Sequence, residues 1–496
     1  MTKFLRISVT FLDGRYYGRS EGGEPEWPPS PLRLLQAVVA ANATALDRGE
    51  ELRRALIWLE CQPAPIIVAP CVKHGAPYVL AVPNNAMDLV AASWAKGGNA
   101  NPAEHRAMKT VSPMTMHGGE TVHFVWQLQP EAEDAAVEAI LSAARNVFRL
   151  GWGLDTVVTD ACRVDSDTLS SLSGERWSPV ESAGYTGLRV PLSGTLGDLE
   201  QRHKAFLGRL GAEGFSPVPP LTAFRTVQYR RPTDPTPRLH VVFELRKGSG
   251  DFLAYAQKKL IHLAGMTRHL AGRAMSQSPP PDAPKDWVER YVMGHREAGD
   301  KNHRQLSYVP LPSIGHQHAD QSLRRVLISA PPGDERWLEH LVRRITGTQL
   351  IPERGTEFDE NEPPTLVRIR SDRVLAHYIR PSNRWTSVTP VILPGHDDRK
   401  RTKTQSLIKT ALRQSGVEQP CRFEWSQLSK FRKSYSAHKY GRDRRPQGFL
   451  RPDHLLTQTA VHLTLEFEDE VRIPGPLVIG AGRHLGLGLM ARYPGA

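Results

Sequence analysis

Apolar and polar residues alternate over positions 5–11, which predicts a strand with one buried face. Ser30 and Pro31 form a typical helix start, and apolar residues at helical spacing follow them. A second strand-like run covers 122–128, and the apolar residues of 137–148 share one helical face. The order strand, helix, strand, helix predicts an α+β domain with a βαβ unit, of the ferredoxin-like (RRM-like) type.

The segment 216–237 is rich in proline, and the pattern restarts after it. Positions 239–245 alternate as a strand, and 252–270 carries apolar residues at helical spacing. Because proline-rich segments often separate domains, we expect a boundary here. The sequence therefore predicts two fused domains, 1–225 and 238–496, built from tandem ferredoxin-like modules.

Length and composition narrow the class of protein. The chain has 496 residues, which exceeds the size of one hydrophobic core and predicts at least two domains. No apolar run approaches the roughly 18 residues that a membrane span requires, and the N-terminus resembles a strand and not a secretion signal. The four cysteines form no CxxC pair, so a structural zinc site is not expected. We expect a cytoplasmic protein that does not bind membranes.

The positive charge is concentrated in one segment. The chain carries 64 Lys and Arg against 52 Asp and Glu, a net charge of +12. Residues 396–451 alone hold fifteen basic and five acidic residues, a net charge of +10, together with six aromatic residues. Cations that follow phosphates and aromatic rings that stack on bases suit nucleic acid, whereas the alternative is a solvated basic loop with core aromatics. The candidate RNA contacts here are Arg399, Lys400, Arg401, Lys403, Lys430, Arg432 and Lys433.

A glycine-rich sequence lies near the C-terminus. Gly480, Gly482, Gly486 and Gly488 surround Arg483 and His484. Glycines allow a backbone to approach a phosphate closely, and arginine binds phosphate through two nitrogens. The sequence is neither a P-loop nor a dinucleotide fingerprint, because no GK[ST] and no βαβ unit follows. Spacing alone leaves phosphate binding and a tightly packed turn equally open.

Two histidines, His316 and His318, follow an apolar segment that begins at Tyr308. With Asp320 they resemble the H-x-H-x-D-H metal motif of metallo-β-lactamase-type hydrolases, but Gln321 stands where that motif needs histidine. Without a metal, two imidazoles can act as base and acid, one taking a proton from a ribose 2′-OH and the other protonating the departing 5′ oxygen. Both forms of chemistry remain candidates.

Several stretches together resemble one family, the CRISPR-associated proteins of type I-G (formerly I-U) systems in which a Cas-five-like and a Cas-six-like subunit are fused. These stretches run from one end of the chain to the other. They are GRYYGR at 14–19, WPPSPLRLLQA at 27–37, LGWG at 150–153, PLPSIGHQHAD at 310–320, RWTSVTPV at 384–391 and GRHLGLG at 482–488.

The resemblance implies that the N-terminal half holds the 5′ handle of CRISPR RNA, with Arg15 and Arg19 on its glycine-rich loop. It implies that the C-terminal half cleaves the repeat of the precursor RNA without metal or cofactor, leaving a 2′,3′-cyclic phosphate and a 5′-OH. We expect His316 and His318 as base and acid, with Tyr308 orienting them.

In the wider Cas-six class the catalytic residue often lies near the first helix of the domain, so His262 or His269 is an alternative. The glycine-rich sequence 480–488 resembles that class's RNA-binding loop. The expected partners are CRISPR RNA and the backbone and large subunits of a type I-G surveillance complex. Two other functions remain possible from sequence: a metal-dependent nuclease or phosphoesterase using His316, His318 and Asp320, and an RNA-binding scaffold without catalysis.

Overall fold

The computed structural model describes residues 3–493 with several gaps. Outside the description lie residues 1–2, 21–22, 47–48, 84–86, 100, 102, 130–133, 182–184, 212–213, 296–303, 317–318, 353–362, 371, 399, 439–447, 469–470 and 494–496. The chain forms two compact units, Met1–Asp234 and Pro235–Ala496. The division falls within the proline-rich segment 216–237, and each unit is described separately below.

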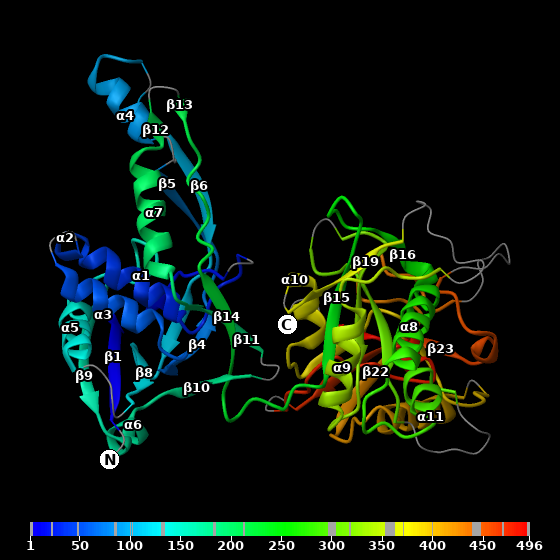
Figure 1. Ribbon diagram of the computed structural model, residues 1–496. Coiled ribbons are helices and arrows are strands. Elements are labelled where there is room, and N and C mark those ends of the chain that lie inside the picture. Colours follow the sequence, from blue (N-terminus) through cyan, green and yellow to red (C-terminus); the bar gives the residue numbers. More distant parts are fainter. Residues whose placement is uncertain are drawn as a thin grey trace. The chain divides into compact units, whose positions relative to one another are not determined.

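The first unit contains a βαββαβ module. Its strands pair antiparallel in the order β3, β8, β1, β9, the order of a ferredoxin-like sheet. Helices α1, α3 and α5 lie beside this sheet (Figure 1). The elements are β1 (Phe4–Phe11), α1 (Pro31–Ala41), α3 (Glu50–Glu60), β3 (Ile66–Ala69), β8 (Thr121–Gln127), α5 (Asp134–Ala144) and β9 (Val157–Val164).

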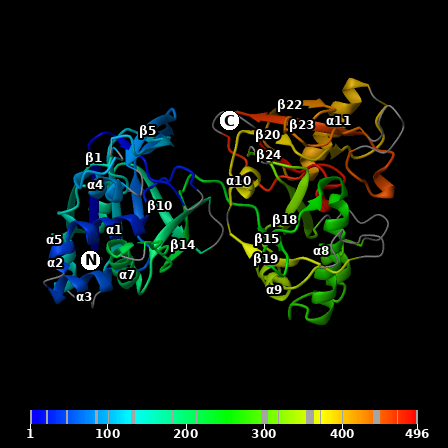
Figure 2. The same cartoon turned by 90° about the horizontal axis from the view of Figure 1, so that it is seen from above.

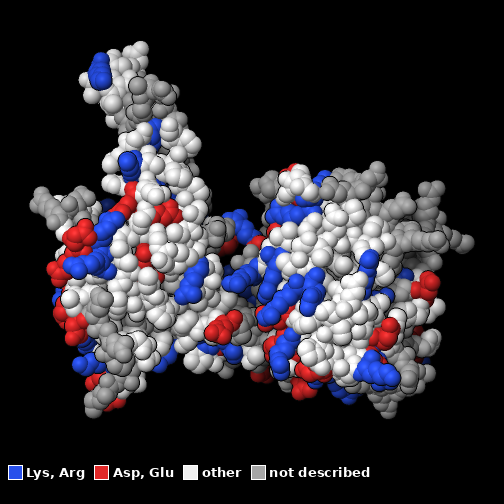
Figure 3. Space-filling model, viewed as in Figure 1, with Lys and Arg blue, Asp and Glu red and all other residues white. Residues whose placement is uncertain are grey.

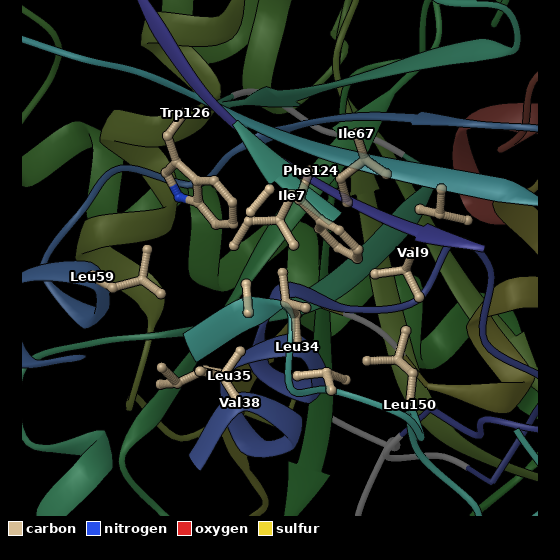
Figure 4. Packing of buried hydrophobic residues seen from close by; sticks show 14 of the residues in the cluster. Ile7, Val9, Leu34, Leu35, Val38, Leu59, Ile67, Phe124, Trp126 and Leu150 are labelled. Carbon is tan, nitrogen blue, oxygen red and sulfur yellow. The ribbon is translucent and has the colours of Figure 1, made fainter. Parts of the chain in front are cut away.

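Apolar side chains of the sheet and the helices form the core of this module. Ile7, Val9 and Phe124 lie on the face of the sheet that meets Leu34 and Val38 of α1 (Figure 4). All five side chains are buried. The alternation seen at 5–11 thus places one face of β1 in the core, as the sequence predicts.

Further elements extend the first unit. The sheet continues from β3 through β10 and β14 to β11, and a hairpin of β5 and β6 with α4 projects from the rest of the unit (Figure 1). The bounds are β2 (Arg15–Tyr16), α2 (Ala43–Leu46), β4 (Cys71–His74), β5 (Tyr78–Pro83), α4 (Met87–Ala95), β6 (Arg106–Val111), β7 (Met114–His117), α6 (Ser166–Ser171), β10 (Glu175–Val180), β11 (Thr186–Pro191), α7 (Thr195–Leu207), β12 (Leu210–Gly211), β13 (Gly214–Phe215) and β14 (Phe224–Arg230).

The second unit begins with another βαββαβ module. Its strands pair antiparallel in the order β17, β18, β15, β19, so the ferredoxin-like arrangement recurs. The elements are β15 (His240–Arg246), β16 (Tyr255–Ala256), η1 (Gln257–Lys259), α8 (Leu260–Gln277), η2 (Val288–Val292), β17 (Ser307–Pro312), β18 (Ser322–Ser329), α9 (Glu335–Ile345), β19 (Thr365–Ile369) and α10 (Arg373–Ile379).

A further module completes the second unit. Its strands pair antiparallel in the order β22, β23, β20, β24, and the glycine-rich turn with η4 stands where the second helix of the pattern would be. Figure 2 shows α11 with β20, β22 and β23 apart from α8 and α9 with β15, β18 and β19. The elements are β20 (Arg384–Ser387), β21 (Val391–Ile392), α11 (Arg401–Gln414), β22 (Cys421–Ser426), η3 (Asp453–Leu455), β23 (Ala460–Phe467), η4 (Arg483–Leu485) and β24 (Met490–Arg492).

The predicted α+β class with tandem ferredoxin-like modules is confirmed, while two helix boundaries are wrong. The helix expected over 137–148 ends at Ala144, and Phe148 is 60% exposed. The helix expected over 252–270 begins at Leu260, because Tyr255 and Ala256 pair with β18 as strand β16. No helix in the described part of the chain is both long and apolar enough to cross a membrane.

One histidine of the first unit predicts a pH dependence of stability. His123 lies on β8 with its Nδ1 atom 2.9 Å from Oγ of Ser8, and burial, followed by the charge of Arg6, lowers its pKa to about 4. Below about pH 6.5 the unfolded chain protonates this ring before the folded chain does. Stability should therefore fall between pH 6.5 and 4, by about 1 to 2 kcal/mol once partial exposure is allowed for.

A urea titration at pH 7 and at pH 4.5 measures this effect. His123→Gln should lose less stability than the wild type over that interval, because glutamine does not titrate. An equal loss in both proteins would contradict the assignment to His123.

Candidate active site

The second unit contains a cavity of about 390 Å³ beside the glycine-rich turn. Its lining comes from α8, from the start of β17, from η3 and from η4. The polar residues that matter most to its chemistry are Arg268, His454, Arg483 and His484. Residues from positions 268 to 485 thus meet at one site although they lie far apart in the sequence.

The charge of the cavity suits an anion. Arg268 and Arg483 contribute guanidinium groups, and none of the described lining residues is Asp or Glu. Guanidinium groups bind phosphate oxygens in pairs, and imidazoles exchange protons near neutral pH. A cavity of this volume falls within the range of small-ligand sites and can take one nucleotide unit.

The ring of His484 is positioned by β17. Its Nδ1 atom lies 2.8 Å from Oγ of Ser307, the first residue of that strand. Where Nδ1 donates to Ser307, the neutral ring carries its lone pair on Nε2 and can accept a proton there. The adjacent Arg483 donates to the carbonyl oxygen of Gly480 at 3.2 Å, which holds the turn closed.

Tyr308 also borders the cavity but is only 1% exposed. Its hydroxyl donates to the carbonyl oxygen of Val292 at 3.0 Å. Burial raises the pKa of the phenol far above its usual range, so it stays protonated at neutral pH. An orienting role for Tyr308 stays a prediction, and its hydroxyl already has a backbone partner.

The glycines of the turn have a clear packing role. Gly486 and Gly488 have φ angles of +81° and +82°, and a Cβ on Gly488 would lie 1.8 Å from the carbonyl oxygen of Ile479. A Cβ on Gly482 would lie 2.8 Å from Cβ of Leu487. The tight-turn interpretation therefore accounts for these glycines, and Gly482 in addition lines the cavity.

A family model described as a CRISPR-associated protein of the GSU0054 family matches residues 4–492. The chain belongs to the GSU0054 family of CRISPR-associated proteins. No curated protein matches the sequence of this family member.

Solved structures similar to this GSU0054-family protein resemble it only distantly. A CRISPR protein from Archaeoglobus fulgidus is 16% identical with a TM-score of 0.20, and the match covers 33% of this chain and 62% of that one. A Cas6-related protein from Pyrococcus furiosus is 11% identical with a TM-score of 0.29, covering 52% of this chain and 100% of that one. A Cas6 product complex is 14% identical with a TM-score of 0.26, covering 51% and 99%.

The paired-histidine loop of this GSU0054-family protein lies elsewhere. His316 is exposed and follows the end of β17, whereas Tyr308 stands at the start of that strand. The structure therefore does not bring His316 and Tyr308 together, and His318 lies outside the described residues. Asp320 is bound by Arg324 at 2.6 Å and by Ser322, which hold the pKa of its carboxyl far below the usual range.

A metal site around Asp320 would have to displace this ion pair. In the part of the chain that the structure describes, no three His, Cys, Asp or Glu side chains gather in a way that could hold a metal ion. His262 and His269 both lie on α8, the first half-buried and the second exposed, and neither belongs to the described lining of the cavity.

The basic segment of the family member presents its cations to solvent. Lys400, Arg401, Lys403, Lys430, Arg432 and Lys433 are all exposed, and Arg399 lies outside the described residues. Lys and Arg side chains are spread over the face of the second unit seen in Figure 3. The expectation of exposed aromatics among them is wrong for Phe431 and Phe449, which are buried in the core.

In the first unit, the loop that carries Arg15 and Arg19 contacts a tryptophan. Arg15 is half-exposed and lies 3.9 Å from Asp13. The guanidinium of Arg19 lies 6.0 Å from the ring centre of Trp152 and donates to the carbonyl oxygen of Thr110. The structure does not bring these two arginines to the cavity, because they belong to the other unit.

Sequence reasoning missed three residues of the cavity region: Arg268, Ser307 and His454. None belongs to a local motif, because each reaches the cavity through the topology of the modules. The available signal was the single histidine in the glycine-rich turn, together with the fact that a module's first helix and second strand are neighbours in the fold.

Proposed function

We propose that this protein is a metal-independent endoribonuclease of CRISPR RNA maturation. The second unit cleaves the repeat of the precursor RNA, and the protein stays bound to its product in a type I-G surveillance complex with backbone and large subunits. The first unit holds the 5′ handle, using the loop with Arg15 and Arg19. Membership of a CRISPR-associated family supports the setting, and the cavity supports the chemistry.

The observation that carries the proposal is the cavity with two histidines, two arginines and no described carboxylate. One imidazole, of His454 or His484, takes the proton of a ribose 2′-OH, whose oxygen attacks the adjacent phosphorus. The other imidazole protonates the 5′ oxygen as its bond to phosphorus breaks. Arg268 and Arg483 stabilise the negative charge that grows on the phosphoryl oxygens.

A second pair of histidines could supply the same acid and base. His316 and His318 remain a candidate pair on their loop, with Asp320 as an added ligand if a metal were used. The geometry favours the cavity pair, because His454 and His484 share one cavity with Arg268 and Arg483. Substitutions at the two places separate these alternatives, as argued in the Discussion.

The setting is tested by the RNA that the protein carries. The full chain is purified from cells that express a CRISPR array, and the small RNAs bound to it are sequenced. Uniform RNAs that share a repeat-derived 5′ end are expected. RNAs of mixed origin with random ends would contradict the proposal.

The protonation states of the two imidazoles predict a pH profile. Single-turnover cleavage of a repeat RNA should show a bell-shaped dependence on pH, because one imidazole must be neutral and the other protonated. The rate is measured from pH 5 to pH 9 at constant ionic strength. A rate that is flat across neutrality would exclude histidine as both base and acid.

A further inference from the structure

Three arginines come together around the last strand of the chain, in residues that do not line the cavity. Arg492 ends β24, Arg380 follows the end of α10, and Arg472 precedes Ile473. Backbone hydrogen bonds join the segments that carry them. Those bonds are Ser382 N–H to Ile473 O at 3.1 Å, Ile473 N–H to Ser382 O at 2.9 Å and Gly475 N–H to Ile379 O at 3.1 Å.

The environment of Arg492 is unusual for an arginine. The side chain is half-buried, and burial lowers its pKa, as do the nearby charges of Arg380 and Arg472. Among the residues that the structure describes, its Nε atom has no hydrogen-bond partner. A partly desolvated cation beside two like charges is costly unless an anion compensates it.

Other half-buried arginines of this chain have a carboxylate partner. Arg33 contacts Glu26 at 2.7 Å, Arg231 contacts Asp234 at 2.8 Å and Arg325 contacts Asp372. Near the three arginines, Arg384 contacts the carboxylate of Glu466 at 3.5 Å and lies over the ring of Tyr493. The carboxylate of Glu466 is therefore already engaged by a different arginine.

We propose that Arg380, Arg472 and Arg492 form a phosphate-binding site for a phosphodiester of the bound RNA, separate from the cavity. Guanidinium groups match the geometry of phosphate oxygens, and contacts to the backbone fix the position of an RNA without reading its sequence. The site would hold RNA away from the cleaved bond. The choice of RNA as the source of the phosphate rests on the proposed function, whereas the anion site itself does not.

The first arm of the test uses inorganic phosphate and the full chain. Thermal melting is recorded with and without phosphate at constant ionic strength. Phosphate should raise the melting temperature of the wild type, and Arg472→Gln and Arg492→Gln should each remove at least half of that rise. Arg413→Gln, an exposed arginine on α11, is the matched control and should keep the full rise. An equal rise in all four proteins would overturn the site.

The second arm measures the affinity for a repeat RNA against salt concentration. Each lost phosphate contact should reduce the slope of log K against log salt by about 0.7 to 0.9. Arg472→Gln, which changes an exposed residue, keeps this arm informative if Arg492→Gln fails to fold. A normal phosphate effect in the first arm with an unchanged slope here would overturn RNA as the ligand. Loss of cleavage alone bears on the proposed function and not on this site.

Discussion

His454→Ala and His484→Ala should each slow cleavage of a repeat RNA by about 100-fold or more, since a positioned acid or base contributes about 10² to 10⁴ in rate. Both side chains line the cavity that also contains Arg268 and Arg483. The measurement is the single-turnover rate at saturating protein, with RNA affinity and thermal melting recorded for every variant. Unchanged affinity and melting would place the loss in the chemical step.

Two controls give this prediction its meaning. His269→Ala changes an exposed histidine on α8 and should leave the rate unchanged. The double variant His316→Ala and His318→Ala should also keep its rate if the cavity pair is catalytic. Loss of activity in that double variant, with full activity in His454→Ala and His484→Ala, would move the chemistry to the loop.

Gly488→Ala should destabilise the second unit by more than about 4 kcal/mol, a loss that only a severe steric or packing conflict produces. The new Cβ would lie 1.8 Å from the carbonyl oxygen of Ile479, and the residue has a φ of +82°. The amide of Ile479 also donates to the carbonyl oxygen of Gly488 at 2.9 Å, so neither segment can move freely. Equilibrium unfolding in urea, or the yield of folded protein, measures the effect.

Gly416→Ala is the matched control for that substitution. Gly416 has a similar φ of +69°, but a Cβ there would meet no atom within 4 Å. Its cost should be limited to the backbone strain of a left-handed residue, about 1 to 2 kcal/mol. Similar losses at both glycines would show that the close approach to Ile479 is not what makes glycine necessary at position 488.

Much of the fold could be predicted from periodicity. The alternation at 5–11 and the restart after the proline-rich segment lead to tandem ferredoxin-like modules, since one buried face per strand is a local signal. Helix ends were less predictable. Apolar spacing continued past Ala144 in the sequence, but Phe148 is exposed because the helix has already ended.

The candidate site was only partly predictable, because its residues meet through tertiary structure. The glycine-rich turn was visible as a motif, and Arg483 and His484 lie in it. Ser307 contacts His484 across 177 positions of the chain, and no local spacing encodes such a contact. The aromatic residues of the basic segment were misleading for the same reason: rings such as Phe431 fill the core, while the neighbouring cations face solvent.

The central claim is cleavage of CRISPR repeat RNA by the protein's own side chains, and one measurement tests it most directly. Purified full-length protein is incubated with a repeat RNA in excess EDTA, and the ends of the products are analysed. The account predicts one cut at full rate, with a 2′,3′-cyclic phosphate on one product and a 5′-OH on the other. No cleavage in EDTA, with activity restored by added zinc or manganese, would contradict it.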